Sequence, residues 1–91
     1  MDVQAAIGKL VDTWCARRAL RPLRVLLPSW PPPNGFTNEW QELWAAMRHV
    51  RATCREELDQ NGESEEVNAV VAELSRRLFP GKPLHEIEQA A

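Results

Sequence analysis

Residues 22–36 read Pro-Leu-Arg-Val-Leu-Leu-Pro-Ser-Trp-Pro-Pro-Pro-Asn-Gly-Phe, and this stretch holds five of the seven prolines in the 91-residue chain. Proline fixes φ and has no amide hydrogen to donate, so one continuous helix cannot pass through such a segment. The residues on both sides are good helix formers with regular apolar spacing. The sequence therefore predicts helices that are separated by a proline-rich connection over residues 21–37.

Three amphipathic helices are predicted outside this connection. Their apolar residues recur at three- and four-residue steps, which places these residues on one side of each helix. The expected ranges are about residues 2–20, 38–60 and 65–79. Such stripes can be buried only against one another, so we expect an all-α three-helix bundle that forms a single domain over residues 1–91.

Local signals predict where these helices begin and end. Asp2 is placed to cap the first helix, which should end near Leu20 because the residue before Pro22 is biased away from helical φ and ψ. Asn61 and Gly62 should end the second helix through a left-handed cap.

Two further short helices are compatible with the sequence. Within the connection, Pro22 can open a single turn that presses Leu23, Leu26 and Leu27 onto the core before Pro28 stops it. Near the end of the chain, a short C-terminal helix can begin at Pro83. Its inward residues would be Leu84 and Ile87.

Charge is distributed unevenly along the chain. The net charge is −2, yet residues 14–55 sum to +5 and residues 56–91 sum to −6. Arginines outnumber lysines by nine to two, and the planar guanidinium suits bidentate recognition of carboxylates and phosphates. The two opposed blocks make pairing between copies of the chain, as in a homodimer, a reasonable expectation.

A binding surface is predicted from the connection and the arginines around it. Trp30, next to Pro31, is the tryptophan expected to be partly exposed, although it can also fold back onto the bundle. Arg51 falls within the apolar arc of its helix, where it can pair with a carboxylate, cover a tryptophan with its methylenes, or join a basic patch. The predicted partner-binding residues are Trp30, Pro31, Arg17, Arg18, Arg21, Arg24, Arg48, Arg51 and Arg55.

The predicted function is binding without catalysis. His49, His85, Cys15 and Cys54 lack the spacing of a metal site or a catalytic pair, and the isolated glycines form no phosphate loop, so no metal or cofactor is expected. We therefore expect a non-enzymatic protein-interaction or regulatory module. One alternative is a nucleic-acid-binding protein that contacts phosphates through its arginines, and a second is a small enzyme with an unrecognised site.

The expected location is the cytoplasm. No apolar run approaches the ~20 residues that cross a bilayer, and the first residues lack a basic segment followed by an apolar one. We expect no contact with a membrane. Two cysteines are too few for a secreted disulfide framework, so they should remain thiols.

Overall fold

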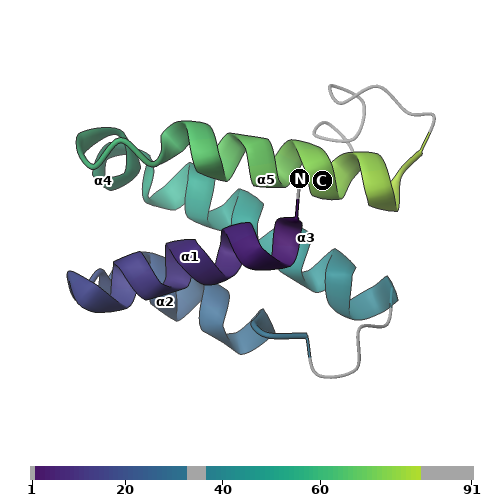
Figure 1. The fold of residues 1–91 in the computed structure, drawn as a ribbon, viewed down its shortest axis with the longest axis horizontal. Helices are drawn as coiled ribbons and strands as arrows, with labels where there is room; N and C mark the ends of the chain where they lie inside the picture. The colour runs from purple at the N-terminus through teal and green to yellow at the C-terminus, as the bar shows by residue number, and fades with distance from the viewer. Residues whose placement is uncertain (1, 33–36, 81–91) are drawn as a thin grey trace.

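The structure of the protein, a computed structural model, describes residues 2–32 and 37–80. These ranges form five α-helices and one 3-10 helix and contain no β-strand (Figure 1). The helices are α1 (Val3–Ala16), α2 (Leu20–Leu26), the 3-10 helix η1 (Leu27–Ser29), α3 (Thr37–Thr53), α4 (Arg55–Gln60) and α5 (Ser64–Leu78). The prediction of an all-α helical bundle is confirmed.

Four helices enclose the core in a closed ring. α1 packs on α2, α2 on α3, α3 on α5, and α5 on α1, whereas α2 and α5 do not contact each other (Figure 1). Each helix contributes its apolar stripe to the space between them, as the periodicity predicts. The main buried residues are Val3, Ile7, Leu10, Trp14, Leu23, Leu26, Leu43, Trp44, Met47, Val50, Leu58, Val67, Val70, Val71 and Leu74.

The first helix begins as predicted and ends earlier than predicted. The amide of Ala5 donates to Oδ1 of Asp2 at 3.1 Å, which confirms the cap. α1 ends at Ala16, because Arg18 adopts a left-handed φ of 54° and the chain turns there. The amides of Arg18 and Ala19 donate to carbonyls of the last helical turn, in the Schellman pattern that satisfies helix ends.

α2 occupies part of the predicted connection and includes the residue before Pro22. The bias against helix at that position is overridden, since Pro22 stands in the first helical turn, where an amide has no intrahelical partner. Leu23 and Leu26 are buried, as expected. The placement of Leu27 on the core was wrong: it is 46% exposed.

The predicted second helix is divided in two at Cys54. The carbonyl of Thr53 accepts a bond from Nη2 of Arg21 at 3.0 Å, and the Thr53 hydroxyl donates back to the carbonyl of His49 at 2.8 Å. Bonds of this second kind bend helices. At the far end, the left-handed cap at Gly62 is confirmed by its φ of 67°.

α5 begins at Ser64 and ends at Leu78, within one residue of the predicted bounds. The C-terminal helix predicted from Pro83 lies outside the described residues.

Adjacent leucines of the 20–29 segment allow a direct test of this packing. Leu26→Ala should lower the free energy of unfolding by about 2–5 kcal/mol, because it leaves a cavity in the core. Leu27→Ala should lower it by less than about 1 kcal/mol, because nearly half of that side chain already faces solvent. Urea denaturation followed by circular dichroism measures both, and equal losses would contradict this placement of α2.

Candidate functional site

The arginines predicted to bind a partner have different surroundings in the folded chain. Arg17 forms ion pairs with Glu63 and, at 3.3 Å, with Glu57. The hydrogen bond with Glu63, assisted by the charges of Glu63 and Glu57, raises the pKa of Arg17 above its usual value. The other oxygen of Glu63 accepts from Nε1 of Trp14 at 2.9 Å. Arg17 therefore joins α1 to the α4–α5 turn.

Arg21 and Arg48 also contact other parts of the chain. Arg21 donates to the carbonyl of Thr53. The guanidinium carbon of Arg48 lies 4.8 Å from the ring centroid of Trp44, which is a cation–π contact. The indole of Trp44 in turn donates to the hydroxyl of Ser75 at 2.8 Å. These contacts stabilise helix packing, while Arg21 keeps an exposed side chain at the surface.

Trp30 lies between its two expected positions. It is half-buried and packs against the core, and its Cζ2 would lie 3.7 Å from a Cβ added at Gly8 of α1. Pro31, directly after it, is exposed. Trp30 thus packs against α1 and remains partly exposed.

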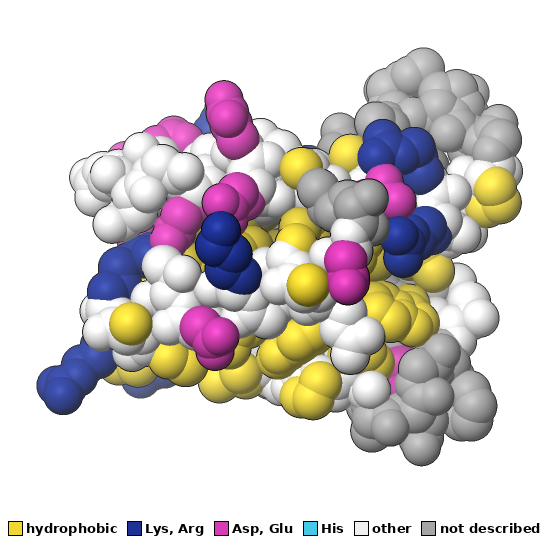
Figure 2. All heavy atoms as spheres, in the orientation of Figure 1, with side chains coloured by type: hydrophobic (Ala, Val, Ile, Leu, Met, Phe, Trp, Pro, Cys, Tyr) yellow, Lys and Arg dark blue, Asp and Glu magenta, His cyan; other side chains and the backbone are white. Residues whose placement is uncertain are grey.

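An apolar and basic face runs along the outside of α2 and the first residue of η1. Leu20 is 57% exposed and Leu27 is 46% exposed, and Arg24 stands between them on the same side of the helix. They are the two exposed large hydrophobic side chains among the described residues. We call Leu20, Arg24 and Leu27 the α2 face. In Figure 2, hydrophobic side chains gather along the lower edge of the molecule, where Figure 1 places α1 and α2.

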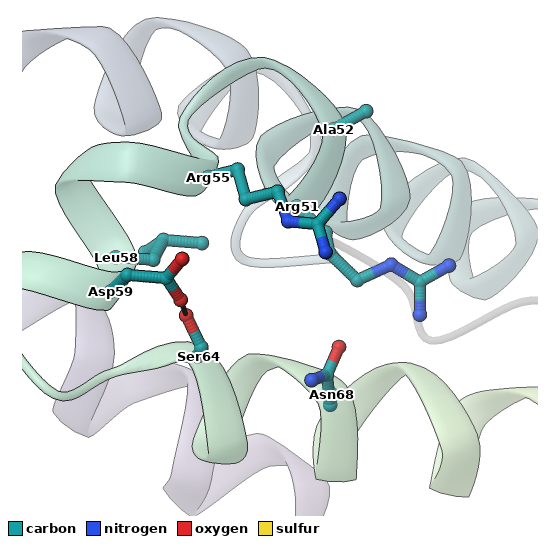
Figure 3. A pocket seen from close by; sticks show the side chains of 7 residues that line it. All are labelled: Arg51, Ala52, Arg55, Leu58, Asp59, Ser64 and Asn68. Carbon is teal, nitrogen blue, oxygen red and sulfur yellow. Dashed lines mark hydrogen bonds between the residues drawn. The ribbon is translucent and has the colours of Figure 1, made fainter.

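A polar cleft of about 560 Å³ separates the α3–α4 junction from α5. Arg51 and Arg55 extend over it from one side, and the side chain of Asn68 faces them from the other (Figure 3). At the opposite end, the hydroxyl of Ser64 donates to Oδ1 of Asp59. The arginine cleft is lined by Arg51, Ala52, Arg55, Leu58, Asp59, Ser64 and Asn68.

The structure thus divides the single predicted surface into two. Arg24 belongs to the α2 face, whereas Arg51 and Arg55 belong to the arginine cleft beside α5, and α2 does not contact α5. Arg18 is exposed at the turn that precedes α2. Arg18, Arg24 and Arg55 form no ion pair with a described residue.

Sequence reasoning missed several residues of these surfaces. The sequence predicts Leu20 at the end of the first helix and Leu27 on the core, so it marks neither as a binding residue. Glu63 has no distinguishing neighbour in sequence, because its partners are more than 40 residues away. Ser64 and Asn68 are four residues apart and therefore share one side of α5; this spacing was the available signal.

Residues 2–32 and 37–80 contain no group of three His, Cys, Asp or Glu side chains arranged to hold a metal ion. Both cysteines are free thiols, Cys15 exposed and Cys54 buried. None of the described helices has the length and apolar character that crossing a bilayer requires. No family model, curated protein or solved structure matches the chain.

Removal of the Glu63 carboxylate tests its structural role. Glu63→Ala should lower the free energy of unfolding by about 2–4 kcal/mol, because it leaves the buried Trp14 donor without an acceptor and removes one of the two carboxylates that pair with Arg17. Glu63→Gln keeps one acceptor and should cost about half as much. Chemical denaturation measures both variants, and a Glu63→Ala protein as stable as wild type would refute this role.

Proposed function

We propose that the protein is a non-enzymatic protein-interaction module, and that the α2 face binds an acidic amphipathic helix of a partner protein. The observation that supports this most strongly is the pair of exposed leucines on either side of an arginine. Large apolar side chains that a chain leaves in water, bordered by charge, are typical of interaction surfaces.

The chemistry of the α2 face specifies the occupant. Leu20 and Leu27 lie seven positions apart, and leucines at this spacing in a partner helix also lie on one side of that helix. Arg24 lies between them and makes no ion pair with a described residue, so a glutamate or aspartate of the partner can pair with it. Arg18 and Arg21 are exposed near the start of α2 and extend the positive potential.

The size of the surface predicts a weak, reversible complex. Burial of the exposed parts of two leucines contributes about 1 kcal/mol each, and stable interfaces cover roughly 800 Å² per partner, more than this short face supplies.

A reducing cytoplasm, where both cysteines stay as thiols, is the proposed location.

A nucleic-acid function is the second candidate, and it is favoured by the guanidinium groups of Arg18, Arg24 and Arg55, which make no ion pair within residues 2–32 and 37–80. Phosphates would pair with these groups as well as carboxylates do. The exposed leucines have no role in phosphate contact, however, and the first turn of α5 holds Glu65 and Glu66. These observations make a protein partner the better proposal.

A library of helical peptides tests the occupant. Panning on the purified protein should enrich sequences with leucines at helical spacing and acidic residues beside them. The best peptide, labelled with fluorescein, should lose about tenfold or more in affinity for Leu20→Ser/Leu27→Ser and for Arg24→Glu in an anisotropy assay. Arg55→Glu is the matched control, and it should bind like wild type.

Three results would overturn the proposal. Peptides that bind all variants equally would place the site elsewhere. If no peptide is enriched and a labelled DNA duplex binds at ~50 mM salt with an affinity that falls steeply as salt is raised, nucleic acid would be the favoured partner. Self-association that disappears in Leu20→Ser/Leu27→Ser, measured by sedimentation, would make a second copy of the chain the occupant. Circular dichroism confirms that each variant is folded.

A further inference from the structure

The arginine cleft spans a local break in a helix. Arg51 belongs to α3 and Arg55 opens α4, with the break at Cys54 between them. The amide of Cys54 still donates to the carbonyl of Val50, and the amide of Leu58 to that of Cys54, so the helical path continues across the break. Residues 51 and 55 therefore keep the spacing of one helix side, and both guanidinium groups reach over the cleft (Figure 3).

The opposite wall offers neutral polar groups. Ser64 and Asn68 of α5 line it, and Asp59 supplies the single carboxylate among the lining residues. Oδ1 of Asp59 accepts from the Ser64 hydroxyl, and no ion pair joins Asp59 to Arg55. The cleft thus has a positive end at the arginines and an acceptor end at Asp59.

The shape of the cleft sets the class of ligand. Its volume of about 560 Å³ lies within the range of small-molecule sites and is far larger than an inorganic ion requires. Ala52 and the buried Leu58 complete the lining of the cleft. Guanidinium groups donate two parallel hydrogen bonds to a carboxylate or phosphate, which are the strongest hydrogen bonds available at such a site.

We propose that the arginine cleft binds a small organic oxyanion, with its phosphate or carboxylate group between Arg51 and Arg55 and a hydroxyl or amino group directed to Asp59. The side chain of Asn68 faces the two arginines from α5 (Figure 3), and its amide can turn to donate to a bound oxyanion. This site is separate from the α2 face, so it does not depend on the peptide-binding proposal.

Titrations of the ¹⁵N-labelled protein test the site, with inorganic phosphate, glycerol 3-phosphate and succinate as probes. Saturable shifts should occur at the Nε–H groups of Arg51 and Arg55 and at the side-chain amide of Asn68. Glycerol 3-phosphate should bind more tightly than inorganic phosphate, because its hydroxyl groups can reach Asp59. Binding of the two phosphates but not succinate would identify an organic phosphate as the ligand class, and the reverse would identify a carboxylate.

Charge-removing variants separate a specific site from general attraction. Arg55→Gln should weaken glycerol 3-phosphate binding about tenfold or more, which is the effect of losing a charged hydrogen-bonded pair. Arg24→Gln removes the same charge from the α2 face and should leave the affinity unchanged. Shifts that stay linear in probe concentration would overturn the proposal, and so would equal shifts caused by chloride at the same ionic strength. A loss of affinity in Arg24→Gln as large as that in Arg55→Gln would also overturn it.

Discussion

The buried carboxylate of Glu63 is the group on which the arrangement of the helices depends. One oxygen accepts from the indole of Trp14 and the other pairs with Arg17, so both ends of the carboxylate are satisfied within the protein. A carboxylate that is removed from water is costly unless it is paired in this way. The pairing holds the end of α1 against the turn between α4 and α5, and it closes one end of the bundle.

The two turns joined by this contact have the same backbone geometry. Each has a left-handed residue followed by an amide that bonds back five residues, from Ala19 to Trp14 and from Glu63 to Leu58. One left-handed residue is Gly62, which adopts that φ without strain, and the other is Arg18, for which it is unfavourable. The early turn at Arg18 frees the following residues to form α2, which completes the ring around the core and leaves two leucines in solvent.

Arginine serves four different purposes on this small protein. Arg17 neutralises the buried carboxylate of Glu63. Arg21 caps the end of α3 by donating to the carbonyl of Thr53, and Arg48 covers the indole ring of Trp44. Arg24 and Arg55 extend from two separate surfaces without an ion pair to a described residue. Arginine therefore contributes to stability at some positions and is accessible for binding at others. The accessible arginines lie on two surfaces, the partly apolar α2 face and the polar arginine cleft, and a binding site is proposed on each.

The helical class, the buried stripes and the ends at Asp2 and Gly62 could be predicted from sequence, because periodicity, capping oxygens and glycine act through neighbours within a few residues. Tertiary contacts decided the rest. The turn after α1 is held by the ion pair of Arg17 with Glu63, 46 positions away, and the break at Cys54 is accompanied by a bond from Arg21. Which arginines pair and which face solvent depends on carboxylates and carbonyls of other helices. The residues near each arginine in the sequence do not predict these partners.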